Sequence, residues 1–288
     1  MENLAILKVC LPKGRIFEKV HALLSDCGLA IRVPERGYRP ESSDPRLAIK
    51  ILKAQNVAAL VGLGSHDIGF TGLDWVAETG ADVVELMDFG FDPVRIVAAA
   101  PEQCDEAELL ARPNLVVVSE YEQLTKRWLQ QRGATFHFMR SYGATEVFPP
   151  EDADLIVDNT SSGKTLVENH LRILDTLLCS TTRLVAHPRA LDNPEKRMVI
   201  EELQLLMKAV IDGRERVLLE MNIDHARLDR LVASLPAMKS PTIAQLYGGQ
   251  AYAVKVAVPS RQVARLLPEL KRLGATDILE TPIRKVVA

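Results

Sequence analysis

Short apolar runs alternate with amphipathic segments through most of the chain, and this alternation constrains the fold more than any other feature. Leu4–Leu11 and Leu47–Leu52 have the length and apolar character of buried strands, whereas Gly14–Cys27 has the spacing of an amphipathic helix. Strands that alternate with helices require crossover connections and therefore predict an α/β fold with a largely parallel sheet. The pattern restarts after Pro101, which predicts two α/β lobes with a cleft at the carboxyl ends of their strands.

The last part of the chain follows a different pattern. From about residue 213 the order of predicted elements is βαββαβ, which is ferredoxin-like. We therefore expect three parts: lobe I over 1–98, completed by about 186–212, lobe II over 99–185, and a small separate domain over 213–288. A long helix is expected to begin near Thr165.

Composition excludes several classes of protein. Lys and Arg total 35 against 38 Asp and Glu, so no basic excess is available for coating nucleic acid. The four cysteines are scattered without a CxxC pair, which argues against a disulfide scaffold or a zinc site. No basic leader and no stretch of ~20 apolar residues is present, so we expect a cytoplasmic protein without a membrane segment.

The segment from Leu155 to Leu166 has the composition of an anion-binding loop. A strand end is followed by Asp158, small hydroxylated residues and Gly163, which lets the backbone approach a phosphate closely. Hydroxyls and free N–H groups at a helix start donate to phosphate oxygens, and Asp158 can accept hydrogen bonds from sugar hydroxyls. Gly163-Lys164-Thr165 is not a Walker A motif, because Asp158 stands where that motif requires glycine. The alternative is a capped strand-to-helix turn that binds nothing.

Several segments, in order, resemble the long form of the ATP phosphoribosyltransferase family. They are Leu11-Pro12-Lys13-Gly14-Arg15, the run Gly64–Asp74, Asp88-Phe89-Gly90-Phe91, Glu146, the loop Asp158–Leu166, and Met238-Lys239-Ser240-Pro241-Thr242. This resemblance implies a two-lobed body like type II periplasmic binding proteins, plus a ferredoxin-like (ACT-like) regulatory domain. It also implies transfer of phosphoribosyl from PRPP to N1 of the adenine of ATP, the first step of histidine biosynthesis, with Mg2+ as cofactor and L-histidine as inhibitor.

The resemblance assigns roles residue by residue. The expected catalytic residues are Lys13, Arg15, Glu146 and Asp158. PRPP is expected to bind Asp158, Thr160, Ser161, Ser162, Gly163, Lys164 and Thr165. The nucleotide is expected near Arg15, Asp67, Gly72, Asp74, Asp88, Gly90 and Phe91, and the regulatory histidine near Ser240 and Thr242. No direct metal ligand is named, since Mg2+ is expected to arrive on the PRPP oxygens.

Each role has a plainer alternative. Lys13 and Arg15 could be surface charges at a helix start, Glu146 an exposed loop carboxylate, and Asp74 a helix cap. The spacer between Glu146 and Asp158 is one residue shorter than the family pattern. Arg36, Tyr38 and Arg39 form a second cationic patch that either helps to bind polyphosphate or belongs to a surface loop.

Two other functions stay open at this point. One is a non-catalytic small-molecule sensor built on binding-protein lobes, and the other is a phosphoribosyltransferase for a different base. The open sheet edge of the small domain favours a homo-oligomer, a dimer and/or a hexamer.

Overall fold

The computed structural model describes residues 5–34, 37–238 and 240–287. Arg36 and Lys239, which belong to motifs named above, lie outside the described residues. The chain divides into two compact units, Met1–Ala22 with Leu29–Ile200, and Leu23–Gly28 with Glu201–Ala288. Each unit is described by itself.

The first unit contains a five-stranded mixed sheet of order β4-β1-β5-β12-β6. Its strands are β1 (Leu7–Pro12), β4 (Leu47–Leu52), β5 (Ile68–Gly72), β6 (Val84–Asp88) and β12 (Thr182–Ala186), and its connecting helices include α2 (Ala54–Gly62) and α3 (Leu73–Thr79). β1 lies parallel to β4 and β5, while β12 is antiparallel to its neighbours. The carboxyl ends of β1 and β5 therefore meet at one edge of the sheet, where Lys13 and Gly72 lie.

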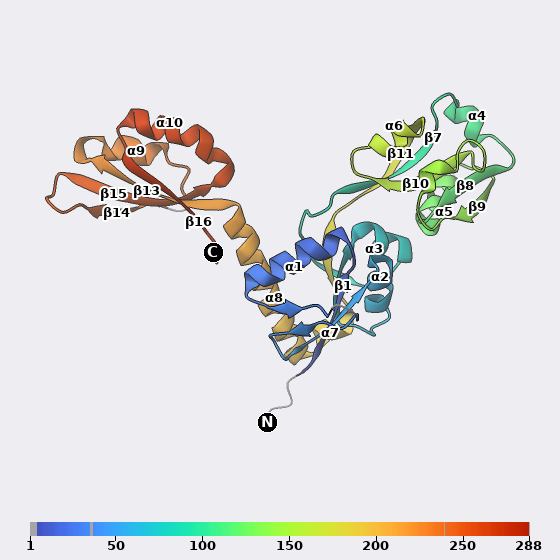
Figure 1. Ribbon diagram of the computed structural model, residues 1–288, viewed down its shortest axis with the longest axis horizontal. Helices are drawn as coiled ribbons and strands as arrows, with labels where there is room; N and C mark the ends of the chain where they lie inside the picture. Colours follow the sequence, from blue (N-terminus) through green and yellow to red (C-terminus); the bar gives the residue numbers. More distant parts are fainter. Residues whose placement is uncertain (1–4, 35–36, 239, 288) are drawn as a thin grey trace. The chain divides into compact units, whose positions relative to one another are not determined.

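The first unit contains a second five-stranded sheet, of order β11-β7-β10-β8-β9. Its strands are β7 (Val94–Pro101), β8 (Leu115–Ser119), β9 (Phe136–Arg140), β10 (Leu155–Thr160) and β11 (Leu171–Ser180), with helices α4 (Glu106–Leu110), α5 (Glu122–Gln131) and α6 (Lys164–Glu168) (Figure 1). Alternate residues of β7 enter two different apolar clusters, Ile96 and Ala98 one, Val97 and Ala99 the other. Both faces of this sheet are therefore covered, which explains the continuous apolar runs in the sequence.

The expected long helix near Thr165 is wrong. α6 is five residues long, and the chain then forms β11 and β12. β11 pairs antiparallel with β7 over its whole length, with two register shifts. Pairing with a strand some 75 residues away in sequence decides this segment, and such a partner is invisible in local periodicity.

The chain passes between the two sheets twice, and the two crossings lie side by side. One crossing joins β6 to β7 and the other joins β11 to β12. The Phe89 N–H donates to the Thr182 carbonyl (3.1 Å), and the Thr182 N–H donates to the Phe91 carbonyl (3.0 Å). The Asp88–Phe91 segment is thus part of the connection between the sheets.

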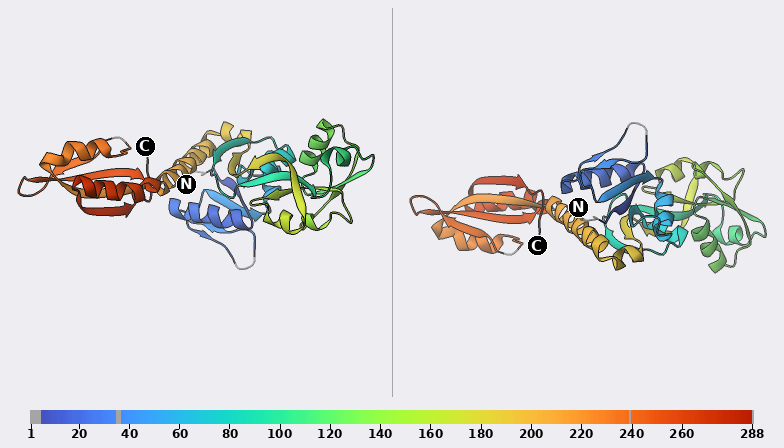
Figure 2. Two further views of the ribbon diagram at one scale, coloured as in Figure 1. Left: turned by 90° about the horizontal axis from the view of Figure 1, so that it is seen from above. Right: turned by 90° about the horizontal axis from the view of Figure 1, so that it is seen from below.

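The second unit contains a four-stranded antiparallel sheet of order β14-β15-β13-β16. The elements are β13 (Arg216–Asp224), α9 (Leu228–Ser234), β14 (Thr242–Gln245), β15 (Ala251–Pro259), α10 (Val263–Leu273) and β16 (Thr276–Pro282). This order confirms the predicted βαββαβ pattern. Alternate residues of β13, such as Leu219 and Met221, pack under α9 and α10 on one face of the sheet (Figures 1 and 2).

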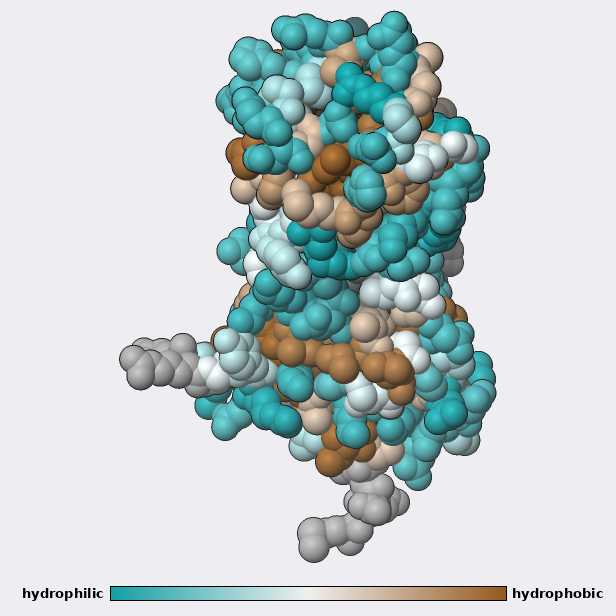
Figure 3. Space-filling model, turned by 90° about the vertical axis from the view of Figure 1, so that its right-hand side faces the viewer, coloured by the Kyte–Doolittle hydropathy of each residue, from teal (hydrophilic) through white to brown (hydrophobic). Residues whose placement is uncertain are grey.

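The remaining elements are short or connect these sheets. They are α1 (Arg15–Cys27), β2 (Ile31–Arg32), β3 (Glu41–Ser42), α7 (Pro188–Asp192), α8 (Pro194–Arg214), and the 3-10 turns η1 (Thr145–Val147), η2 (His225–Arg227) and η3 (Ser260–Gln262). Among the described residues, no helix combines the length and apolar character needed to cross a bilayer. On the face drawn in Figure 3, hydrophilic residues cover most of the surface and apolar residues form smaller patches.

Candidate active site

Two neighbouring pockets of the first unit lie at the carboxyl ends of β1, β5 and β10, and they share Arg15 and Asn159. The larger has a volume of 290 Å³ and is lined by Arg15, Glu146, Asp158, Asn159, Thr160, Ser161, Ser162, Thr165 and Leu166. The smaller has a volume of 180 Å³, and its lining includes Lys13, Arg15, Gly72, Asp74, Trp75, Tyr121 and Ser180. The structure therefore brings together all four expected catalytic residues around one shared arginine.

The loop between β10 and α6 is shaped by its own hydroxyl groups. The Gly163 N–H donates to Thr160 Oγ1 (2.9 Å), and the Lys164 N–H donates to Ser162 Oγ (3.4 Å). Gly163 adopts φ +79°, a left-handed conformation that glycine tolerates without cost. Lys164 is exposed and forms an ion pair with Glu168 (3.5 Å), so its side chain lies on the surface. Because α6 is so short, it has no long helix dipole to attract an anion. The hydroxyl and N–H groups of the loop are therefore the groups that can bind one.

Asp158 is a half-buried carboxylate in the larger pocket. Burial raises the pKa of Asp158 to about 6, and the negative charges of Glu120 and Glu146 act in the same direction. Hydrogen bonds from the Asn159 N–H (2.7 Å) and the Thr145 side chain oppose this rise. Glu146 lies on η1 and lines the same pocket, so the short spacer does not remove it from Asp158.

Lys13 and Arg15 follow β1 directly and bring positive charge to the two pockets. The Lys13 N–H donates to the Leu52 carbonyl (2.7 Å), which fixes the backbone against the end of β4. The Lys13 ammonium lies 4.0 Å from the centre of the Tyr38 ring, a cation–π distance. Within the described part of the chain, neither cation is paired with a carboxylate. Both are thus available for a polyanion.

Asp74 is buried and organises the smaller pocket. It accepts hydrogen bonds from Ser180 Oγ (2.6 Å) and the Tyr121 hydroxyl (2.9 Å), which join α3 to the ends of β11 and β8. The Tyr121 ring stacks on Trp75 with centroids 4.6 Å apart. A Cβ at Gly72 would collide with the Asp74 carboxylate, so this position needs glycine.

The structure places the other predicted nucleotide residues outside both pockets. Asp88 accepts hydrogen bonds from Thr181 Oγ1 (2.7 Å) and the Gly90 N–H (2.9 Å) and forms an ion pair with Arg183. Phe91 stacks on Phe89 in the crossing between the sheets.

Asp67 lies at the opposite end of β5 from Gly72. It is buried, forms an ion pair with Lys196 (2.7 Å) and accepts the Lys8 N–H (2.7 Å). In the second unit, Ser240 precedes β14 and Thr242 begins it, and both are at least partly exposed.

Sequence reasoning missed several lining residues. Tyr121, Ser180, Thr181 and Thr182 line the smaller pocket, whereas Asn159, which lines both pockets, falls within the predicted PRPP loop. A third pocket, of 850 Å³, adds a set from α2, α3 and the ends of β8 and β9, including Lys53, Gln55, Glu78, Glu120, Gln123 and Arg140. Glu120 and Tyr121 directly follow β8, so the rule that sites lie beyond the carboxyl ends of strands could have found them.

Comparison with known proteins identifies relatives along the whole chain. The family model described as ATP phosphoribosyltransferase matches residues 53–209, and the model described as HisG, C-terminal domain, matches residues 213–285. Two curated relatives are ATP phosphoribosyltransferases of Chlorobium phaeovibrioides and Pelotomaculum thermopropionicum. Each is 38% identical, and the matches cover 98% of this chain and 98% and 99% of the relatives.

One solved structure shares the fold of most of the chain. It is a chain of the ATP phosphoribosyl transferase (HisG:HisZ) complex from Thermotoga maritima, with a TM-score of 0.62 and 27% identity. The match covers 70% of this chain and 98% of that chain.

Proposed function

The chain belongs to the ATP phosphoribosyltransferase family, and from this premise we infer that it transfers the 5-phosphoribosyl group of PRPP to N1 of the adenine of ATP. Pyrophosphate is released, and the reaction is the first step of histidine biosynthesis. The observation that carries this function is the family match over 53–209, together with relatives 38% identical over nearly the full length. The geometry supports it, because Arg15 lines both the pocket of the hydroxyl-rich loop and the pocket next to it.

We assign the loop Asp158–Thr165 to PRPP. Its hydroxyls and N–H groups would bind the 5-phosphate, and Asp158 and Glu146 would accept hydrogen bonds from the ribose hydroxyls. Support comes from the shared pocket of these residues and from the glycine conformation at Gly163. Gly72 and Asp74, in the adjoining pocket, are assigned to the nucleotide side together with Arg15. The remaining predicted nucleotide residues line neither pocket, so they would affect nucleotide binding only by supporting the surrounding structure. They are Asp67, Asp88, Gly90 and Phe91.

The proposed chemistry needs positioning and charge stabilisation rather than a general base. Adenine N1 attacks C1 of the ribose with its lone pair, the bond from C1 to the pyrophosphate oxygen breaks, and no proton has to leave N1 first. Lys13 and Arg15 are placed to stabilise the negative charge that develops on the leaving pyrophosphate. Holding the acceptor in line with C1 supplies the rest of the rate enhancement.

Mg2+ is part of this proposal as a cofactor carried on the PRPP oxygens. Among the described residues, no cluster of three or more His, Cys, Asp or Glu side chains could hold a metal by itself. Mg2+ is usually bound by one or two carboxylates plus substrate oxygens, and Asp158 and Glu146 are the carboxylates that line the PRPP pocket. Bound there, the ion would neutralise charge on the diphosphate of PRPP.

The two five-stranded sheets are proposed as the lobes of a binding-protein-like catalytic body. The expected bounds, 1–98 with 186–212 and 99–185, differ from the sheets at the two crossings, because β7 (Val94–Pro101) lies in the second sheet and β12 (Thr182–Ala186) in the first. Residues from Glu201 onward belong to the second compact unit. The match to the C-terminal family model and the βαββαβ order support an ACT-like regulatory domain over 213–288. We propose that L-histidine binds there near Ser240 and Thr242, that the chain forms a homo-oligomer, and that it works in the cytoplasm, where ATP and PRPP are made.

One assay tests the function and its regulation. The full chain with ATP, PRPP and Mg2+ should release pyrophosphate and form phosphoribosyl-ATP, and replacing ATP by other bases or nucleotides should abolish turnover. Asp158→Ala and Lys13→Ala should each cripple this turnover, whereas the charge-matched control Lys271→Ala, on α10, should not. Added L-histidine should inhibit the wild type, and Thr242→Val should weaken that inhibition while leaving uninhibited turnover unchanged. Wild-type rates in Asp158→Ala and Lys13→Ala would refute the site.

A further inference from the structure

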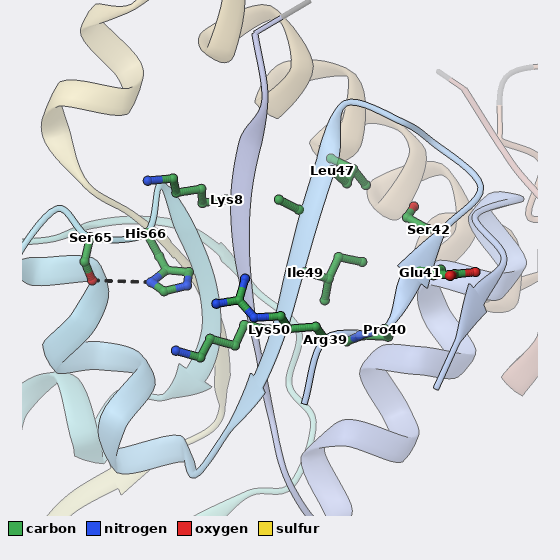
Figure 4. A pocket seen from close by; sticks show the side chains of 11 residues that line it. Lys8, Arg39, Pro40, Glu41, Ser42, Leu47, Ile49, Lys50, Ser65 and His66 are labelled. Atoms are coloured by element: carbon green, nitrogen blue, oxygen red, sulfur yellow. Dashed lines mark hydrogen bonds between the residues drawn. The ribbon is translucent and has the colours of Figure 1, made fainter. Parts of the chain in front are cut away.

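One cationic region of the first unit lies apart from the candidate active site and includes Arg39 of the cationic patch named in the sequence analysis. It is a pocket of 520 Å³ whose lining includes Lys8, Arg39, Glu41, Lys50, Ser65 and His66 (Figure 4). None of its lining residues belongs to the pockets around Arg15. Its volume is within the range of small-molecule sites in proteins.

Strand pairing places the lysines of this pocket. β1 and β4 are parallel neighbours, with Lys8 opposite Ala48 and Cys10 opposite Lys50. Lys8 and Lys50 therefore stand on the same face of the sheet, one step of the side-chain alternation apart. β4 is the edge strand of that sheet, so the pocket opens beside an edge. His66 reaches it from the turn after α2, with Nδ1 3.3 Å from Ser65 Oγ (Figure 4).

The positive charges in this pocket lack partners. Among the described residues, Lys8, Arg39 and Lys50 form no ion pair. Glu41 is the one carboxylate among the described lining residues, and in Figure 4 it lies on the far side of the pocket from His66. Asp67 is close to His66, but it is already engaged by Lys196 and the Lys8 N–H.

The positive charges of Lys8, Lys50 and Arg39 all act on the His66 side chain. Burial lowers the pKa of His66, and the positive charges of Lys50 and Lys8 lower it further, with a smaller effect of Arg39. The charge of Asp67 opposes them and does not prevail. Like charges held this close in a concave site repel one another, and a bound anion relieves that repulsion.

We propose that this pocket is a second anion site, which binds a small phosphorylated or polyphosphate ligand with two or more negative charges. Lysine ammonium and arginine guanidinium groups form charge-assisted hydrogen bonds with phosphate oxygens. Ala48 lies opposite Lys8 on the same face as the two lysines, whereas Leu47 and Ile49 line the pocket from the opposite face of β4, so the cationic face is the part that would hold the ligand. Apart from His66, the described lining offers no ring for stacking a base, which favours an inorganic or sugar-type phosphate. The proposal does not depend on the transferase activity.

The test must separate this pocket from the active site, because both attract anions. The full chain is titrated with pyrophosphate, and separately with inorganic phosphate, by calorimetry. The wild type should show a site that survives Arg15→Ala, which disables the active-site pocket. The pair Lys8→Gln with Lys50→Gln should weaken that site about 100-fold or more, because two charge-assisted hydrogen bonds to the anion are lost together. The charge-matched pair Lys208→Gln with Lys271→Gln should bind as the wild type does.

Tryptophan fluorescence checks that the variants fold. The charge-conserving pair Lys8→Arg with Lys50→Arg should retain the anion binding that the glutamine pair loses. Retention of wild-type affinity in the double glutamine variant would overturn the proposal. Loss of all binding of both anions in Arg15→Ala alone would do the same, because every bound anion would then lie in the active site.

Discussion

Replacing Asp158 by asparagine should stabilise the first unit against unfolding and at the same time abolish phosphoribosyl transfer. Burial, with the charges of Glu120 and Glu146, raises the pKa of this carboxyl from 3.8 to about 6. The difference corresponds to about 3 kcal/mol at a pH where the carboxylate is ionised in both states. Because Asp158 is only half-buried and keeps hydrogen bonds, we expect about 1–3 kcal/mol of stabilisation in Asp158→Asn at pH 8.

The sign of the pH dependence follows from proton linkage. Between about pH 4 and pH 6 the folded unit binds a proton at Asp158 that the unfolded chain has released, so the stability contributed at this position falls as pH rises. Above about pH 6 the cost of the buried charge is complete, and below about pH 4 it vanishes. The advantage of Asp158→Asn over the wild type should therefore be largest at pH 8 and close to zero at pH 4.

Tryptophan fluorescence gives a readout confined to the first unit, because Trp75 and Trp128 both lie in it and the chain has two tryptophans. A stabilisation of 1–3 kcal/mol should raise the midpoint of thermal unfolding by about 2–10 °C in a unit of this size. Asp44→Asn is the opposite control, because the side-chain hydrogen bond from Arg46 lowers the pKa of Asp44 and its loss should destabilise at pH 8. A destabilised Asp158→Asn at pH 8, or an effect equal at pH 4 and pH 8, would refute this reasoning.

Three further changes test other parts of the site. Arg15→Lys keeps the charge but loses the planar guanidinium that faces both pockets, and kcat/KM for PRPP should fall about 100-fold while stability stays the same. Gly163→Ala meets no close atom but forces φ +79° on a β-carbon, so it should cost about 1–2 kcal/mol of stability and raise the KM for PRPP. Tyr121→Phe leaves Asp74 without one of its two side-chain donors and should destabilise the first unit by about 1–3 kcal/mol in denaturant titrations. An unchanged KM for PRPP in Gly163→Ala would contradict the assignment of the 5-phosphate to that loop.

Local patterns predicted most elements of the fold, because strand and helix periods are short-range. The antiparallel strands β11 and β12 were not predicted from local patterns. Leu171–Ser180 is apolar enough for a helix, and its partner strand β7 lies far back in the sequence. The same holds for the site. The loop at Asp158 carries its hydroxyls in one stretch, whereas the bond from Tyr121 to Asp74 joins residues 47 positions apart and leaves no sequence pattern.

Strand direction sorts the candidate residues in a way that a motif alone does not. Asp67 and Gly72 belong to one short sequence motif, yet they lie at opposite ends of β5, which at about 3.3 Å per residue separates them by about 17 Å. In the first sheet Lys13 follows β1 and Gly72 ends the parallel strand β5, so both lie at the same end of that sheet, and in the second sheet Tyr121 follows β8. Asp67 precedes its strand and instead binds Lys196 at the other end. Substituting Asp67 should consequently lower stability with little change in the KM of either substrate, whereas substituting Gly72 should impair nucleotide binding.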